Sequence, residues 1–70
     1  MNNVKGQQVR LKGLTKKGRE RIKQHGDVWT INEVSRQNLE NHLLLIAPDG
    51  DWRWVFEKSD LNFAIVEVVS

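Results

Sequence analysis

The sequence contains no cysteine, so neither a disulfide bond nor a thiolate metal site can stabilise its fold. Proline occurs only once, and no apolar run approaches the roughly 20 residues that a helix needs to cross a bilayer. The N-terminus lacks the hydrophobic stretch of a signal peptide. These absences predict a soluble, cytoplasmic protein with no membrane partner.

The length of the chain limits the size of its core. Its 70 residues predict one domain, 1–70, and a domain of this size buries only about 60% of the surface of its unfolded chain. Tyrosine is absent, and three tryptophans and two phenylalanines are present. Because such side chains bury the largest areas, we expect them to carry much of the core.

The strongest local signal is a β-hairpin in the second half of the chain. An apolar run, residues 43–47, is followed by Pro-Asp-Gly at residues 48–50. Proline presets the turn, aspartate bonds its own main chain, and glycine accepts the left-handed conformation that closes a bulged hairpin. Side chains alternate along a strand, so Trp52, Trp54 and Phe56 are predicted to share one face and to build the core.

The remaining sequence predicts three further strands and one helix. Apolar patterns predict strands over residues 7–12, 28–35 and 63–69, with a polar connection at residues 36–41 and a short helical turn within residues 57–62. After the first strand, a helix is predicted to begin at the N-cap Thr15 and to end at Gly26. The alternation of the second strand shifts at residues 32–33, which predicts a β-bulge.

The predicted helix carries Leu14, Gly18, Ile22 and His25 on one stripe, so we expect it to lie on the sheet rather than to build the core. Glycine inside a helix costs about 1 kcal/mol relative to alanine, which predicts a close backbone approach at Gly18. The residues expected in the core include Leu11, Trp29, Ile31, Leu45, Trp54, Phe56 and Val66.

This order of elements resembles the Src-homology-3-like (SH3-like) small β-barrel. The resemblance implies a mostly β fold, a five-stranded antiparallel barrel with a short helix between strands one and two and a helical turn before strand five. Residues 6–11, followed by Lys17-Gly18, are also similar to the KOW module, a nucleic-acid-associated form of this barrel. Barrels that bind proline-rich peptides use a tyrosine-rich groove. This chain has no tyrosine, so we do not expect it to bind proline-rich peptides.

The net charge of +2 hides a strong asymmetry. Residues 1–25 contain eight Lys and Arg and one acidic residue, whereas residues 26–70 contain three basic and eight acidic residues. Such a separation indicates a partner of opposite charge. The alternative is that the two parts neutralise each other in the folded chain.

The sequence offers little for catalysis or metal binding. His25 and His42 are not spaced as metal ligands. Asp49 and Asp51 flank a turn glycine and are typical of turn chemistry, and Ser59 lacks the glycines of a nucleophile elbow. We therefore expect no enzyme activity, no metal and no cofactor.

Two binding functions remain open. In the first, a basic face on the first strand and the helix binds the phosphates of a nucleic acid. The candidate residues are Arg10, Lys12, Lys16, Lys17, Arg19, Lys23 and Arg53. In the second, the chain is an adaptor or inhibitor that binds another protein through a charged face and an exposed tryptophan. An accessory protein encoded by a phage or a mobile element is one class of protein with this size and composition.

Overall fold

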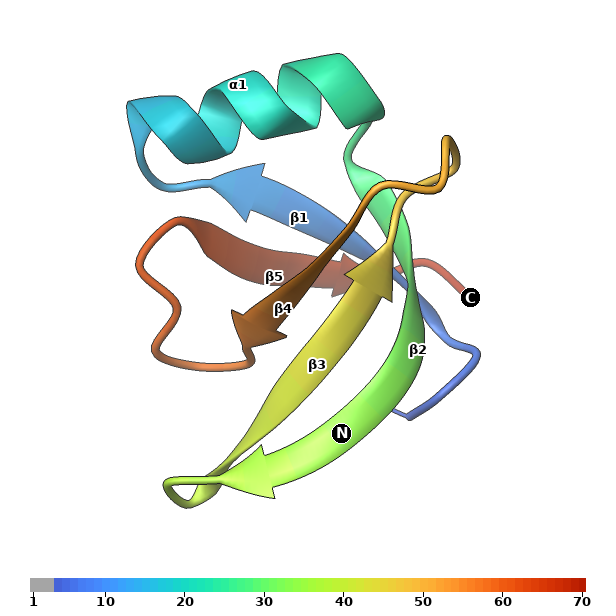
Figure 1. Ribbon diagram of the computed structural model, residues 1–70, viewed down its shortest axis with the longest axis vertical. Coiled ribbons are helices and arrows are strands. Elements are labelled where there is room, and N and C mark those ends of the chain that lie inside the picture. The colour runs from blue at the N-terminus through green and yellow to red at the C-terminus, as the bar shows by residue number, and fades with distance from the viewer. Residues whose placement is uncertain (1–3) are drawn as a thin grey trace.

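The computed structural model describes residues 4–70 (Figure 1). Its elements are, in chain order, β1 (Gln8–Gly13), α1 (Lys16–His25), β2 (Val28–Gln37), β3 (Glu40–Ile46), β4 (Trp52–Phe56) and β5 (Phe63–Val68). This order confirms the predicted mostly β fold with a short helix between the first two strands. In the described part of the chain, no helix has the length and apolar character needed to cross a membrane.

The five strands form one antiparallel sheet in the order β4-β3-β2-β1-β5. Among the described residues no ladder joins β4 to β5, so the curved sheet in Figure 1 stays open between these two edges. The β2–β3 ladder shifts register between Ile31 and Glu33, which confirms the predicted bulge. A second shift lies between Arg10 and Leu11, where β1 pairs with β5. Bulges bend strands, and these two help the sheet to wrap around its core.

The core consists of apolar side chains from all five strands and from the segment that follows β3. Its buried members are Val9, Leu11, Trp29, Ile31, Leu43, Leu45, Ala47, Val55 and Phe63. The prediction was wrong for Trp54 and Val66, which are 40% and 53% exposed, and Phe56 is only half-buried. A small interior that already encloses the whole of Trp29 has little room for another indole, and on β4 the smaller Val55 faces inward instead.

Helix α1 is held by the two predicted caps. The side chain of Thr15 accepts a hydrogen bond from the N–H of Gly18, with 3.0 Å between oxygen and nitrogen. Gly26 has a φ of 92° and donates its N–H to the carbonyl of Ile22. At Gly18 a Cβ would overlap the backbone carbonyl oxygen of Asn62, which confirms the predicted close approach. The helix therefore lies directly against the segment that leads into β5.

The connection between β2 and β3 is shorter than predicted. Gln37 pairs with Glu40, and only Asn38 and Leu39 lie between them, with φ values of 50° and 66°. Two successive positive φ angles make a mirror-image turn that matches the twist of the strands. Such turns favour asparagine followed by glycine, and here leucine stands in the glycine position, so the turn was not predicted and both strands extend further than expected.

The predicted helical turn before β5 is absent. The connection from β4 to β5 contains turns and a bend but no helix. Glu40, which is 9% exposed, accepts hydrogen bonds from the N–H groups of Lys58 and Ser59 and from the hydroxyl of Ser59. The side chain of Asp60 accepts the N–H groups of Asn62 and Phe63, which a helical turn would pair with main-chain carbonyls.

Candidate functional site

Five of the seven predicted nucleic-acid-binding residues lie on exposed positions of β1 and α1. We call these five residues the basic surface: Lys12, Lys16, Lys17, Arg19 and Lys23. None of them forms an ion pair with any residue in the range 4–70. Their positive charges are therefore not neutralised within the described chain.

The first turn of α1 is unusual in its charge. Lys16 and Lys17 occupy it, and it contains no acidic residue. The helix dipole places partial positive charge at this end, where acidic side chains are preferred and cations are unfavourable by a few tenths of a kcal/mol up to about 1 kcal/mol each. Two lysines at this position lower the stability of the helix, and a bound anion would remove that penalty.

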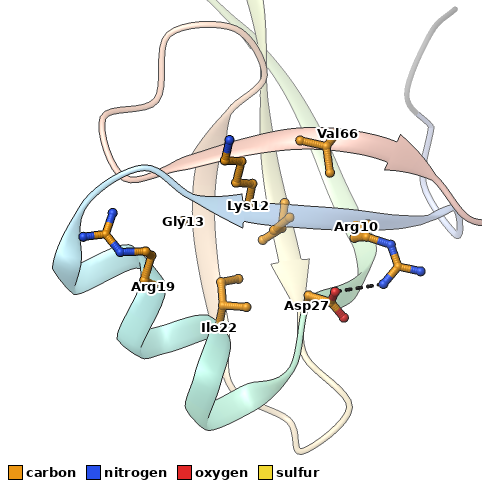
Figure 2. Close-up of a pocket in the computed structure, with 8 residues that line it drawn as sticks. Arg10, Lys12, Gly13, Arg19, Ile22, Asp27 and Val66 are labelled. Carbon is orange, nitrogen blue, oxygen red and sulfur yellow. Dashed lines mark hydrogen bonds and ion pairs between the residues drawn. The ribbon is translucent and has the colours of Figure 1, made fainter.

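A groove of about 420 Å³ lies beside the basic surface, between α1 and the strands β1 and β5 (Figure 2). It is lined by Arg10, Leu11, Lys12, Gly13, Arg19, Ile22, Asp27 and Val66. Figure 2 shows Ile22 pointing from the helix toward β1, while Lys12 extends from β1 on the side away from the helix. No aromatic side chain lines the groove, so it offers apolar contact and positive charge but no stacking surface.

Arg10 lies at the end of this groove and is already paired. Its guanidinium donates to Glu67 over 2.7 Å and to Asp27 over 2.8 Å. The hydrogen bonds to Glu67 and then to Asp27 raise the pKa of Arg10 above its already high ordinary value. Two carboxylates thus balance this cation, and Arg10 contributes less to the attraction of an anion than the basic surface does.

Arg53 lies on another part of the sheet. It belongs to β4, which is separated from β1 by β2 and β3. Its guanidinium carbon lies 5.2 Å from the ring centroid of Phe63, a cation–π contact that reaches from one open edge of the sheet to the other. The structure therefore does not bring Arg53 together with the basic surface.

A second exposed surface lies on β3 and β4, and it contains the exposed tryptophan expected for a protein-binding function, at a position that was predicted to be in the core. On β4, Trp52 is 60% exposed and Trp54 is 40% exposed. The ring of His42 on β3 stacks on Phe56, with 4.2 Å between centroids, and lies 4.8 Å from the ring of Trp54. We call these four residues the aromatic strip: His42, Trp52, Trp54 and Phe56. Large exposed aromatic groups on one face are typical of interaction sites.

One feature of the sequence, the position of His42, indicates that the aromatic strip faces solvent. The prediction that Trp52, Trp54 and Phe56 share a face is correct, but they face outward. The run on β3 is apolar on both sides, so it does not show which side turns inward. His42 lies directly opposite Phe56 in the ladder. A titratable imidazole on the same face as the aromatic side chains favours the solvent side over the core.

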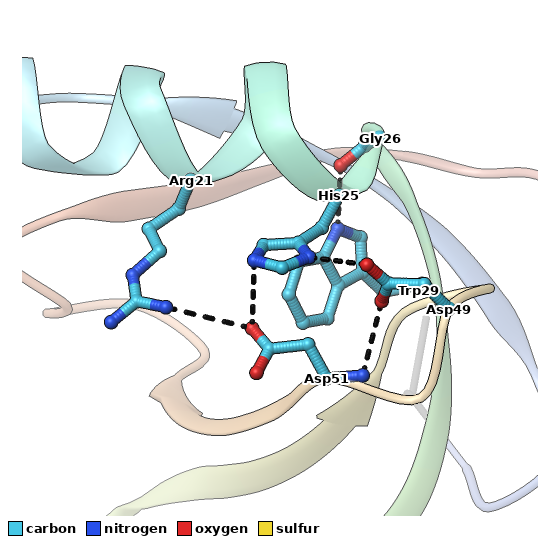
Figure 3. A network of polar contacts seen from close by, with 6 residues as sticks. All are labelled: Arg21, His25, Gly26, Trp29, Asp49 and Asp51. Atoms are coloured by element: carbon cyan, nitrogen blue, oxygen red, sulfur yellow. Dashed lines mark hydrogen bonds and ion pairs between the residues drawn. The ribbon is translucent and has the colours of Figure 1, made fainter.

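A polar network connects the C-terminal end of α1 to the β3–β4 turn (Figure 3). The Nδ1 of His25 lies 2.5 Å from Asp49 and its Nε2 lies 3.3 Å from Asp51, which Arg21 also approaches at 3.7 Å. The N–H of Asp51 donates to the side chain of Asp49, which confirms the predicted turn chemistry. The hydrogen bond to His25, together with that N–H, lowers the pKa of Asp49 below its ordinary value. The network fixes the end of the helix to the hairpin.

Among residues 4–70, no cluster of three or more His, Asp or Glu side chains is arranged to hold a metal ion. The basic surface with its groove and the aromatic strip are the two surfaces that carry a functional argument. Comparison with protein-family models, with curated proteins and with solved structures finds no match to this chain.

Proposed function

We propose that this chain is a non-enzymatic, cytoplasmic binding module that binds nucleic acid through the basic surface. The observation that supports this proposal is the set of five exposed cations that have no partner within residues 4–70. The proposed site is smaller than the one predicted from sequence, because Arg10 is paired with two carboxylates and Arg53 lies elsewhere.

The proposed mode of binding is contact with phosphate groups. Lysine and arginine neutralise phosphates and release condensed counterions, which gives affinity that depends on salt and little on sequence. The groove beside Lys12 and Arg19 has no aromatic residue on which a base could stack. We therefore expect single strands and duplexes of similar charge to bind with similar affinity.

We also propose that the open sheet is an SH3-like small barrel. The strand order β4-β3-β2-β1-β5 and the helix inserted after β1 support this assignment. The contact of Arg53 with Phe63 bridges the opening where a barrel would close. The similarity of residues 6–11 and Lys17-Gly18 to a KOW module stays a prediction. Because that module is associated with nucleic acids, the similarity agrees with the proposed ligand.

The nucleic-acid proposal can be tested by fluorescence anisotropy with a thymidine oligonucleotide of about 24 nucleotides and with a duplex of about 12 base pairs, which carries a similar number of phosphates. We expect micromolar affinity at about 20 mM salt and a log–log salt slope of about −0.7 to −0.9 for each phosphate neutralised. In the variant Lys16→Gln/Lys23→Gln, which loses two cations of the basic surface, that slope should decrease in magnitude by about two such contacts.

The matched control is Arg36→Gln/Lys58→Gln. Both residues are exposed and lie outside the basic surface, and the change in net charge is the same. This control should keep the salt slope of the unmodified chain, because its cations are not at the proposed contact. Equal slopes for the two variants, or no binding of either oligonucleotide at low salt, would exclude the basic surface as a nucleic-acid site.

The aromatic strip favours a second candidate function, the binding of another protein. Trp52 and Trp54 expose rigid apolar area at an edge of the sheet. Tryptophan is among the residues that most often carry the binding energy of protein interfaces. The strip and the basic surface lie on strands that are not neighbours, so the two functions do not exclude each other.

A further inference from the structure

The free edge of β4 carries main-chain groups of two tryptophans that have no partner within residues 4–70. At the two ends of the strand, the carbonyl of Asp51 and the N–H of Glu57 form hydrogen bonds with the segment of β3. In an antiparallel ladder such bonds are made by alternate residues. Residues 51, 53, 55 and 57 therefore direct their main-chain groups toward β3. Trp52 and Trp54 alternate with them, so their N–H and C=O groups point away from β3, toward the open edge.

The free edge has a defined length. The N–H of Phe56 is taken by the side chain of Asp60, with 3.1 Å between nitrogen and oxygen. This bond closes the edge at the end of β4. The open part is therefore residues 52–54, long enough for two residues of another strand to exchange main-chain hydrogen bonds with it.

Arg53 lies between the two tryptophans, on the opposite face of β4. It forms no ion pair with any residue in the range 4–70, and its Nε is buried without a hydrogen-bond partner. Its guanidinium reaches from β4 over the ring of Phe63, toward the open side of the sheet. A buried donor without an acceptor is costly, and a carboxylate that came to this edge would supply the acceptor.

We propose that residues 52–54 bind an extended peptide of another protein by antiparallel strand addition, and that this peptide carries an acidic residue between two apolar residues. The inference rests on the second proposed function and specifies its partner. In such a pairing the peptide residue opposite Arg53 is a non-hydrogen-bonded partner, whose side chain lies closest. The residues before and after it lie opposite Trp52 and Trp54 and place apolar side chains beside the indoles.

The structure favours β4 over β5 for this role. Proteins protect free edges with charged side chains, proline or covering segments. On β5, the exposed Glu67 places a charged side chain on the edge strand, and a short ion pair joins it to Arg10. On β4 the open segment has neither proline nor an outward charge, and its exposed side chains are two indoles. The guanidinium of Arg53, which has no ion-pair partner among residues 4–70, gives this edge a preference for an acidic partner.

The test uses the full chain and a synthetic peptide, acetyl-Ser-Val-Glu-Val-Ser-amide, followed by two-dimensional NMR. We expect saturable shifts of the amide signals of Trp52, Arg53 and Trp54 and slower hydrogen exchange at the two tryptophan amides. N-methylation of both valines removes the donors that face β4 and should weaken binding at least tenfold. N-methylation of the glutamate blocks an N–H that faces away, so this matched peptide should bind as the parent does.

A charge exchange tests the role of Arg53. The peptide with lysine in place of glutamate should bind at least fivefold more weakly to the unmodified chain. The variant Arg53→Glu should prefer that lysine peptide, provided that its amide spectrum shows the native fold. Equal affinity of the glutamate and lysine peptides for the unmodified chain would overturn the proposed preference for an acidic residue.

The outcomes separate this inference from the function on which it rests. If the peptide shifts the tryptophan signals but the methylated valine peptide binds equally well, the strip binds protein by its side chains and strand addition is wrong. If neither peptide shifts these signals, the proposed strand-addition site is wrong, and the nucleic-acid proposal is unaffected. Strand addition is supported if the valine-methylated peptide loses binding while the parent peptide and the glutamate-methylated peptide still bind.

Discussion

At the scale of single residues, the direction of one side chain decides whether a tryptophan stabilises the fold or is available to a partner. Trp29 is wholly buried and its Nε1 donates to the carbonyl of Gly26 over 2.8 Å. Trp54 lies on the outer face of β4 and is 40% exposed. The same residue type therefore has a structural role on β2 and a surface role on β4.

This difference can be measured by substitution. Trp29→Ala should lower the free energy of unfolding by about 3–5 kcal/mol, because it leaves a large cavity and an unpaired carbonyl. Trp54→Ala should cost about 1 kcal/mol or less, since the side chain is already partly hydrated. Urea denaturation of the two variants is the measurement. Equal losses of stability would contradict the assignment of the strip to the outer face.

At the scale of elements, α1 is attached to the sheet at both ends. Near its start, the hydroxyl of Thr15 donates to the side chain of Asn62, and the buried Gly18 lies against the backbone of the same residue. At its end, His25 contacts Asp49 in the β3–β4 turn. The four residues of the basic surface that lie on α1 are therefore held in place relative to Lys12 on β1.

The contact at Gly18 can be tested with one added methyl group. Gly18→Ala should destabilise the chain by about 1–3 kcal/mol, because the new Cβ would meet the carbonyl oxygen of Asn62. Helix propensity alone predicts the opposite sign, a gain of about 1 kcal/mol. Thermal unfolding decides between them. Gln24→Ala, at an exposed position of the same helix, serves as the control and should change the stability by less than about 0.5 kcal/mol.

The attachment at the other end of the helix should depend on pH. The pKa of Asp49 is lowered from its ordinary 3.8, first by the hydrogen bond to His25. A carboxyl whose pKa is lower in the folded chain binds fewer protons in the folded state than in the unfolded state. It therefore stabilises the fold at pH values above its ordinary pKa. This contribution is lost as the pH falls through the lowered pKa.

We therefore expect the urea midpoint of the unmodified chain to fall as the pH is lowered from about 5 to about 2. In Asp49→Asn this fall should be smaller, because the variant no longer has the titrating group. Glu40, whose pKa is lowered from 4.5 by the hydroxyl of Ser59 and the N–H of Lys58, contributes to the same fall. An identical acid dependence in Asp49→Asn and the unmodified chain would refute a role for this carboxylate.

At the scale of the whole molecule, local features were predictable from sequence, whereas features that depend on distant contacts were not, apart from the close approach at Gly18. The caps of α1, the bulge in β2 and the positive φ of Gly50 follow from neighbouring residues, and the structure has them. The exposed lysines of α1 follow from helical periodicity. The pairing of Arg10 does not, because its partner Glu67 is 57 residues away. The outward direction of β4 likewise depends on what already fills the interior.

The same separation between local and distant contacts affects how the chain reaches its fold. The strands β2, β3 and β4 follow one another through short turns, whereas β5 completes the sheet only by returning to β1. Closing so long a loop costs more entropy than closing a hairpin, so the three-stranded part should form early and the β1–β5 ladder late. Interactions that form after the folding barrier mainly govern the rate of unfolding. We therefore expect the packing of β5 against β1 to govern mainly how long the native state survives once it has formed.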